Sequence, residues 1–353
     1  MGIATLERNG VTVLLKLLTW ARCGSWGGWL GLLGGLILLP VVRSETAGDA
    51  PSVLIVVGAV GESDYQTNFV KQAVAWTAAC ERASARHTLL DGTDGTLTNQ
   101  LERLRSALIA EPKTGTAPFW LVLIGHGTFN GQVARLNLVG PDLSETDLAA
   151  ALASFERPLV VINAASASAP FLKALSRTNR VIITSTRSGF EQNFSRFGAR
   201  FAQAIADPAA DLDHDGQTSV LEAFLSASAQ VAEFYKTEGR LLTEHALIDD
   251  NGDGMGTPAD WFRGTRATKK SKDGTSLDGV RAQQLHLVRS AEDLGLSAAQ
   301  REQRDRLELE IAALRERKGE FVEDKYYAQL ERLLLELAQV YAGGDGKAAG
   351  EGR

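Results

Sequence analysis

The sequence predicts an α/β fold, with a mostly parallel sheet and helices on both of its faces. Continuous apolar runs such as Phe119–Ile124 and Pro158–Ile162 are typical of strands that are covered on both sides. Segments with helical spacing separate these runs, and such alternation favours parallel strands joined by helical crossovers. Acidic loops of the EF-hand type and a C-terminal α-helical hairpin are expected to follow the sheet.

The composition is that of a globular protein with room for several structural units. The chain has 353 residues, of which 44% are hydrophobic and 23% are charged. A formal net charge of -6 without a long basic stripe argues against nucleic acid as a partner. Cys80 lies in a helical pattern, which indicates a buried structural thiol rather than a nucleophile.

Near the N-terminus, residues 24–42 carry no charge and follow Arg8, Lys16 and Arg22. This pattern predicts either a cleaved secretory signal or a signal anchor that stays in the membrane. The positive flank predicts that the rest of the chain lies outside the cytoplasm, membrane-anchored or secreted. Residues 1–50 are therefore assigned to a signal segment with its polar spacer.

Residues 51–208 carry the alternating strands and helices of the α/β domain. The expected strands are 53–59, 87–90, 119–124, 134–139, 158–162 and 180–185. The expected helices are 65–86, 97–110, one that opens at 144, and 171–176. The helix at Ser144 is predicted because Ser144 and Asp147 have the spacing of a capping box.

Two of these strands end in residues that carry chemistry. Strand 119–124 runs into Gly125-His126-Gly127, and strand 158–162 runs into the segment 163–168. Ligands of open parallel sheets bind beyond the carboxyl ends of the strands, so the two ends are expected to lie side by side. Flanking glycines leave a histidine exposed, and both a site role and a packed, vestigial histidine fit His126.

This pair of strand ends resembles that of the caspase-like cysteine peptidases, most closely the legumain-type branch. The resemblance implies that His126 is the general base and that the nucleophile follows the next strand. Ala165 stands where the resemblance places the cysteine, and a methyl group cannot act as a nucleophile. Val60 stands where the resemblance places an asparagine that orients the histidine. The resemblance therefore implies a family member whose catalytic site is degenerate.

Other residues near the same sheet edge leave alternatives open. Ser166 and Ser168 follow the second strand, so a hydrolase that uses His126 with one of these serines is the alternative interpretation. Arg187 and Glu191 follow strand 180–185, where the resemblance implies a substrate pocket. A surface loop that caps the next helix explains Arg187 and Glu191 equally well.

Residues 209–263 form an extension with two acidic loops. Segment 211–222 matches the twelve-residue EF-hand template, in which alternate oxygen ligands converge around a glycine turn. A helix at 221–235 follows it. The expected ligands of Ca²⁺ in this loop are Asp211, Asp213, Asp215, the carbonyl of Gln217, Ser219 directly or through water, and both carboxylate oxygens of Glu222.

The second acidic loop, segment 249–260, matches the same template without a helical exit. Pro258 and several glycines interrupt its last part. A looser calcium site and an Asx-rich turn remain equal alternatives. The expected ligands are Asp249, Asn251, Asp253 and Asp260.

The C-terminal part reads as a linker, a helical hairpin and a tail. Residues 264–279 are polar and glycine-punctuated, which is typical of a linker. Residues 280–342 show 3–4 apolar spacing, with Leu285, Leu287 and Val288 assigned to the first helix, and this predicts an amphipathic hairpin that packs within the chain. Residues 343–353 are expected to be disordered.

Together these patterns favour an exported or membrane-anchored, caspase-like protein that binds calcium and lacks the catalytic cysteine. Its expected role is a binding or scaffold module for a peptide or protein partner. A calcium-stabilised structural module of an envelope assembly would show the same features.

Overall fold

The computed structural model describes residues 51–93 and 98–348. The uncharged segment 24–42, for which a signal or anchor is expected, lies outside these residues. Within the described ranges, no helix is both long enough and apolar enough to cross a membrane.

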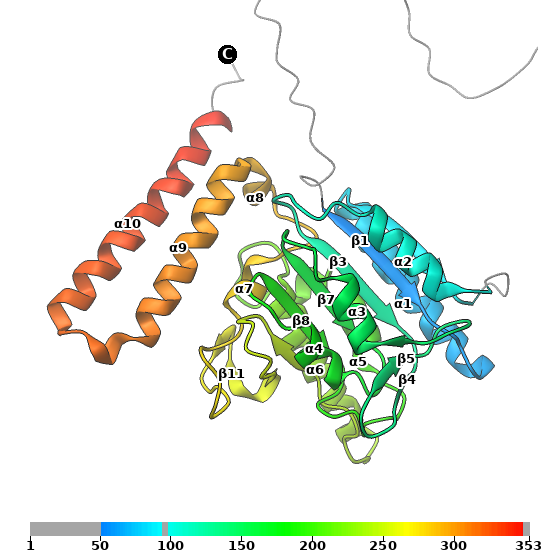
Figure 1. The fold of residues 1–353 in the computed structure, drawn as a ribbon. Coiled ribbons are helices and arrows are strands. Elements are labelled where there is room, and N and C mark those ends of the chain that lie inside the picture. The colour runs from blue at the N-terminus through cyan, green and yellow to red at the C-terminus, as the bar shows by residue number, and fades with distance from the viewer. Residues whose placement is uncertain (1–50, 94–97, 349–353) are drawn as a thin grey trace, which may run out of the picture. The chain divides into compact units, whose positions relative to one another are not determined.

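A seven-stranded sheet with the order β10-β9-β8-β7-β3-β1-β2 forms the centre of the fold (Figure 1). The strands from β8 to β2 are parallel to one another, whereas β9 is antiparallel to β8 and β10 is antiparallel to β9. The strands are β1 (Ser52–Val57), β2 (Arg86–Asp91), β3 (Phe119–Ile124), β7 (Leu159–Asn163), β8 (Arg180–Thr184), β9 (Leu247–Asp249) and β10 (Thr257–Pro258).

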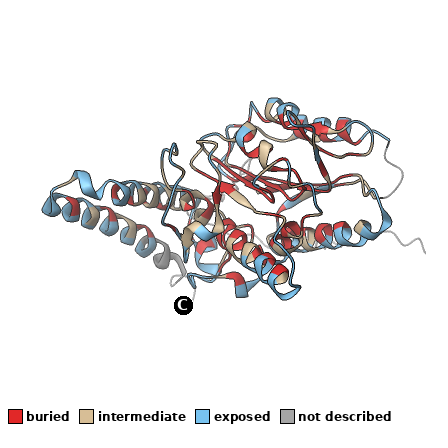
Figure 2. Cartoon of the chain, turned by 90° about the horizontal axis from the view of Figure 1, so that it is seen from below, coloured by how far each residue is buried: buried red, intermediate tan, exposed pale blue. Residues whose placement is uncertain are grey.

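Helices cover both faces of this sheet, and Figure 2 shows the buried strands between the helical layers. One face carries α1 (Ser63–Arg82), α5 (Phe197–Ala204) and α6 (Val220–Thr237). The other face carries α2 (Gln100–Ala110), α3 (Glu145–Ala151) and α4 (Ala169–Leu175). Successive strand residues point to opposite faces, so Val122 joins the first core and Leu121 the second. The predicted fold class, a mostly parallel sheet with helices on both faces, is confirmed.

Short strands lie outside the central sheet and were mostly not predicted. A three-stranded sheet contains β4 (Gly127–Phe129), β5 (Ala134–Leu136) and β6 (Leu143–Ser144). A two-stranded sheet contains β11 (Phe262–Arg263) and β12 (Arg266–Ala267). Because β12 lies within 264–279, and Asp278 is only 3% exposed, this segment packs on the protein, although its composition indicated a linker.

Helix α5 was also not predicted, because the group that caps it comes from a distant part of the chain. The carboxylate of Glu244 is buried and accepts hydrogen bonds from the backbone N–H groups of Arg196 and Phe197, at 2.8 and 3.0 Å. The Ser195 hydroxyl donates to the same carboxylate at 2.7 Å. Since helix N-termini have N–H groups without internal partners, this carboxylate fixes where α5 begins.

The C-terminal part contains short helices followed by a hairpin. The helices are α7 (Val280–Gln284), α8 (Ala291–Gly295), α9 (Ala298–Glu316) and α10 (Glu323–Ala348), with the 3₁₀ helices η1 (Pro208–Ala210), η2 (Ala259–Trp261) and η3 (Lys318–Glu320). Helices α9 and α10 share a small apolar core that includes Leu307, Ile311 and Leu333, as the hairpin prediction required. Helix α10 extends past residue 342, where the hairpin was expected to end.

The prediction that Leu285, Leu287 and Val288 belong to a helix is wrong. Helix α7 ends at Gln284, and the following residues lie along the segment 211–222 instead. The carbonyl of Leu285 accepts a hydrogen bond from the backbone of Val220 at 2.9 Å, and His286 forms a β-bridge with Ser219. The apolar residues whose spacing suggested a helix therefore lie in a non-helical segment that contacts residues 219 and 220.

Candidate functional site

The ends of β3 and β7 lie side by side, as expected from parallel pairing. Leu123 and Asn163 are register partners, and the backbone of Ala164 donates to the carbonyl of Leu123 at 2.8 Å. One step further along, the N–H of Gly127 donates to the Ser166 hydroxyl at 3.0 Å. The segment that carries His126 and the segment that carries Ala165 therefore meet at one edge of the sheet.

His126 lies in a cluster of aromatic rings. Its ring centroid is 4.6 Å from that of Tyr65 and 5.1 Å from that of Phe69, both edge-to-face. Burial lowers the pKa of His126 below its usual value, although a hydrogen bond to the backbone of Val60 and the charge of Glu62 oppose that change. The imidazole is therefore neutral near pH 7. The backbone of Val60 contacts the histidine that the resemblance expects an asparagine side chain to orient.

Ala165 is 1% exposed and packs with the core on the α2, α3 and α4 face. Phe69, beside His126, belongs to the core on the opposite face. The backbone of Ala165 is fixed at both ends, since its N–H donates to Asn163 Oδ1 at 3.1 Å and its carbonyl accepts from Ser185 Oγ at 2.5 Å. The methyl group at position 165 thus fills space in a tight turn.

The hydroxyls of Ser166 and Ser168 are engaged in contacts that hold the loops together. Ser166 Oγ accepts from the N–H of Gly127 at 3.0 Å and donates to its carbonyl at 3.2 Å. Ser168 Oγ contacts the hydroxyls of Ser185 and Thr186, both at 3.2 Å. Among residues 51–93 and 98–348, no hydrogen bond joins either serine to His126. Both hydroxyls are buried and already have partners, whereas a nucleophile needs access to a base.

Arg187 and Glu191 do lie together, and a histidine that the sequence did not point to completes the group. Arg187 Nε is 3.4 Å from Glu191 Oε1, and its backbone N–H donates to Glu191 Oε2 at 3.0 Å. His245 Nδ1 lies 2.6 Å from Glu191 Oε1. His245 is an isolated histidine before β9, so no local pattern marked it. The arrangement is an ion pair at the rim of the sheet edge, consistent with the loop interpretation.

Cys80 confirms the structural interpretation given to it. Its side chain is 0% exposed in α1, and burial raises its pKa to about 12. A thiol with this pKa does not form the reactive thiolate near neutral pH.

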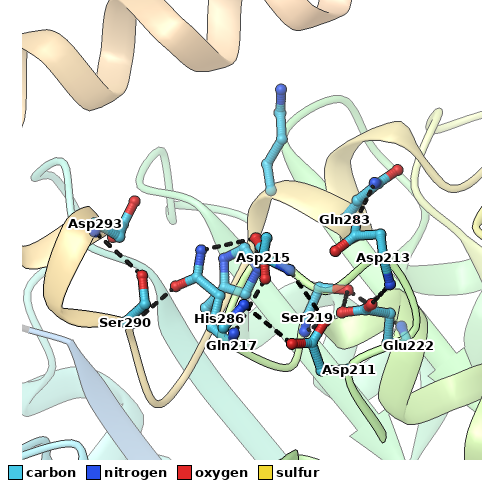
Figure 3. A network of polar contacts seen from close by, with 12 residues as sticks. Asp211, Asp213, Asp215, Gln217, Ser219, Glu222, Gln283, His286, Ser290 and Asp293 are labelled. Atoms are coloured by element: carbon cyan, nitrogen blue, oxygen red, sulfur yellow. Dashed lines mark hydrogen bonds and ion pairs between the residues drawn. The ribbon is translucent and has the colours of Figure 1, made fainter. Parts of the chain in front are cut away.

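The first acidic loop brings three carboxylates together (Figure 3). Oxygen atoms of Asp211, Asp213 and Asp215 all lie within 4.8 Å of one another. The Asp211 carboxylate also accepts hydrogen bonds from His214, Asp215 and Gly216 of its own loop, at 2.7, 3.3 and 3.0 Å. His214 and Gly216 have φ values of 62° and 86°, the left-handed conformation that turns these N–H groups toward the first aspartate.

Glu222 does not lie with these carboxylates in the way the template predicts. Its side chain is 1% exposed, and Oε1 accepts from the backbone of Leu212 and Asp213 at 2.7 and 3.1 Å. Its Oε2 accepts from the backbone and hydroxyl of Ser219, both at 2.8 Å, which completes the capping box of α6. Four N–H and O–H donors thus hold both carboxylate oxygens of Glu222 in this structure, and its role as a ligand of Ca²⁺ stays a prediction.

The second acidic loop has the backbone of the first. Gly252 and Gly254 have φ values of 82° and 74°, and both donate to the Asp249 carboxylate, at 2.9 and 2.8 Å. Asn251 and Asp253 likewise accept from backbone N–H groups within the loop, at 2.9 and 2.8 Å. The loop joins β9 to β10 rather than two helices, which explains the missing helical exit.

Asp260, the expected last ligand of the second loop, is exposed on η2 beyond β10. Asp278, from the expected linker, closes the second loop instead and accepts from the backbone of Asp250 and Asn251 at 2.9 and 3.2 Å. Burial and the neighbouring Asp250 raise the pKa of Asp278 to about 8. Sequence reasoning missed Asp278 because it follows the loop across an irregular segment.

Segment 283–290, which comprises the end of α7 and the residues that follow it, lies against the first acidic loop (Figure 3). Gln283 Nε2 donates to Asp213 Oδ2 at 2.8 Å, and the backbone of Ser290 donates to Gln217 Oε1 at 3.0 Å. His286 Nε2 is 3.9 Å from Asp215 Oδ2. Beyond this segment, Asp293 of α8 forms a buried ion pair with Arg304 of α9. The acidic loop is thus connected through polar contacts to the helical hairpin.

A cavity of about 1080 Å³ adjoins these contacts. Asp213 and Asp215 line one part of it, and Leu334, Leu337 and Tyr341 of α10 contribute an apolar wall. His126, Ala165, Arg187 and Glu191 do not line it, so this cavity is separate from the sheet edge.

Comparisons with known proteins found similarity only to solved structures of low sequence identity. No protein-family model matches the chain, and no curated protein matches it. The initiator caspase Dronc from Drosophila is 12% identical, with a TM-score of 0.41 over 59% of this chain and 82% of that one. Caspase-1 from Spodoptera frugiperda is 8% identical, with a TM-score of 0.37 over 57% and 86%. Protein GSU0716 from Geobacter sulfurreducens is 12% identical, with a TM-score of 0.36 over 51% and 89%.

The environment of His126 predicts a specific dependence of stability on pH. Because its pKa is lowered on folding, the unfolded chain binds more protons than the folded chain as pH falls below about 6.5. The contribution of His126 to stability is therefore present at pH 7.5 and lost toward pH 5, by about 1.4 kcal/mol for each unit of pKa depression. We expect the thermal midpoint of His126→Phe, which keeps an aromatic ring, to fall less between these two pH values than that of the wild type.

Equal pH slopes for the wild type and His126→Phe would contradict this prediction. Tyr65→Phe is a suitable control, because it changes a ring that contacts His126 but keeps the imidazole, and it should leave the slope of the wild type unchanged.

Proposed function

We propose that this protein is an exported or membrane-anchored, caspase-like module of the legumain type, catalytically inactive, which binds calcium and acts as a binding or scaffold unit. The observation that carries the proposal is the convergence of the Asp211, Asp213 and Asp215 carboxylates within 4.8 Å, on a loop that contacts segment 283–290. A peptide or protein is the expected partner, and the cavity of about 1080 Å³ beside the loop is the surface that would receive it.

The donor set of the first loop fits calcium. A calcium ion takes oxygen ligands at about 2.3–2.6 Å, so ligands on opposite sides of one ion lie about 5 Å apart. The three carboxylates lie within that separation, and their mutual repulsion is the electrostatic cost that a divalent cation removes. The carbonyl of Gln217 and the side chain of Ser219 are the further oxygens offered by the template, and Glu222 would have to leave its backbone partners to join them.

A scaffold role follows from what the loop touches. Asp213 and Gln217 bind segment 283–290, and that segment leads to the buried Asp293–Arg304 ion pair with the hairpin. An ion that repositions Asp213 would change the contact with Gln283. Calcium would thereby influence the wall of the cavity that α10 helps to form.

The inactive assignment rests on the sheet edge. Position 165 has no nucleophile, and the hydroxyls of Ser166 and Ser168 are buried among other partners. The His126 imidazole lies among aromatic rings. These are the contacts of a packed structure, and they support a binding role over hydrolysis.

Calcium is expected to raise the thermal stability of the full-length protein. An extracytoplasmic EF-hand-type site has a Kd on the order of 10⁻⁴ to 10⁻³ M, and calcium at about 100 times Kd stabilises the folded state by about 2.7 kcal/mol. The sharpest variant is Asp213→Asn, because the exposed Asp213 carboxylate accepts from Gln283 rather than from the backbone of its own loop. Asp213→Asn should remove most of the calcium-dependent rise in Tm.

The matched control is Glu292→Gln, which makes the same charge change at an exposed position of α8 and should keep the full response. Sodium chloride at equal ionic strength separates screening from binding. A melting curve that calcium leaves unchanged, together with no heat of binding by calorimetry, would contradict the calcium proposal.

No peptidase activity is expected from the purified protein. Fluorogenic peptides with Asn or Asp before the cleaved bond test the family's chemistry, and thiol- and serine-reactive acyl probes test for any nucleophile. Turnover that His126→Ala abolishes would overturn the inactive assignment. Covalent labelling of Ser166 or Ser168 would support the hydrolase alternative.

Export is tested with a reporter fused after residue 60. The uncharged run 24–42 behind three basic residues should bring the reporter outside the cytoplasm, and its deletion should keep the reporter inside. A cytoplasmic reporter on the intact N-terminal segment would contradict the proposed localisation.

A further inference from the structure

The two edges of the central sheet are built differently. One edge ends in β10, which is short, antiparallel and contains Pro258, a residue that cannot donate to a further strand. The other edge is β2, a six-residue strand without proline or lysine. Within residues 51–93 and 98–348, β2 pairs only with β1. Edge strands normally carry devices that block further pairing, and β2 has few of them.

The backbone groups that face outward from β2 follow from its pairing with β1. The N–H of Arg86 donates to Pro51 at 3.2 Å, and the N–H of Gly92 donates to Val57 at 2.8 Å. Since alternate residues of a parallel strand bond to the same neighbour, the even-numbered residues of β2 face β1. The N–H and C=O groups of His87, Leu89 and Asp91 therefore face the open edge.

The side chains beside this open edge are apolar and exposed. Leu89 is 40% exposed, and Val74 on the neighbouring α1 is 62% exposed. Both line a groove of about 320 Å³ between α1 and β2, together with Val70. Apolar side chains that flank a row of unpaired backbone groups are the surface that strand addition buries.

We propose that β2 pairs antiparallel with β2 of a second copy of this chain, with Leu89 at the two-fold axis. In an antiparallel hydrogen-bonded pair, opposite residues exchange both of their N–H···O bonds. Centring the pair on Leu89 uses all of the outward-facing residues, because His87 then lies opposite Asp91 of the other copy. The same register stacks the two Leu89 side chains beside Val74 of both copies.

The sequence of β2 makes a second copy the fitting occupant. An isologous interface must be self-complementary, and in this register each His87 imidazole meets an Asp91 carboxylate, which accepts from an N–H of the ring. Shifting the register by two residues leaves outward-facing groups unpaired at both ends. The pairing concerns a different surface from the calcium loop and is independent of the function proposed above.

Disulfide formation tests the register. Opposite residues of a hydrogen-bonded antiparallel pair have Cα atoms about 5.5 Å apart, within the range of a disulfide bond. We expect full-length Leu89→Cys to form a covalent dimer under mild oxidation. Thr88→Cys is the matched control, because Thr88 is also exposed but lies opposite Leu90 of the other copy and points to the other face of the sheet. The wild type reports any background from Cys23 and Cys80.

Sedimentation velocity of the full-length protein over about a hundredfold concentration range tests the association itself. Leu89→Lys brings two like charges together at the axis and should weaken the dimer about tenfold or more, whereas Leu335→Lys on α10 should not. A monomer at all concentrations, an oligomer that Leu89→Lys leaves unchanged, or equal cross-linking of Leu89→Cys and Thr88→Cys would each overturn the proposal. Pairing of β2 with another protein alone would do the same.

Discussion

The burial of the central sheet on both faces is the constraint on which the rest of the structure depends. Every residue of β3 is 0% or 1% exposed, and the indole N–H of Trp120 is buried there without a hydrogen-bond partner. A charged side chain within this strand would therefore be costly to bury. Polar groups can therefore collect only where strands end. His126, the turn after β7 and the hydroxyls after β8 meet at the same edge for this reason.

At that edge the serine hydroxyls form hydrogen bonds with backbone groups and with other hydroxyls of the neighbouring loops. Ser166 satisfies both backbone groups of Gly127, and a Cβ on Gly127 would lie 2.0 Å from the carbonyl oxygen of Ser166. The two loops approach so closely that position 127 requires a glycine. The Ser166 hydroxyl holds the loops together through its two hydrogen bonds to Gly127.

The two acidic loops share the same backbone turn but lead into different secondary structure. In both, the first aspartate accepts N–H groups from a turn with two left-handed residues. The first loop leads into helix α6, and Glu222 forms part of the capping box at the start of that helix. The second returns as a strand, and Asp278 closes it from outside. The first loop also contacts segment 283–290, which leads to the buried ion pair between Asp293 and Arg304 of the hairpin.

The sequence by itself determined the parallel strands of the central sheet, most of the long helices, the cap at Ser144, and the convergence of Asp211, Asp213 and Asp215. Each depends on spacing within about one turn or one strand, which a local pattern records. Only the tertiary structure decided the rest. Glu244 caps α5 from 47 residues away, His245 meets Glu191 across 54, and Gln283 reaches Asp213 across 70. Such contacts depend on where the chain returns after a turn, and the side chains involved look the same in sequence whether or not a partner reaches them.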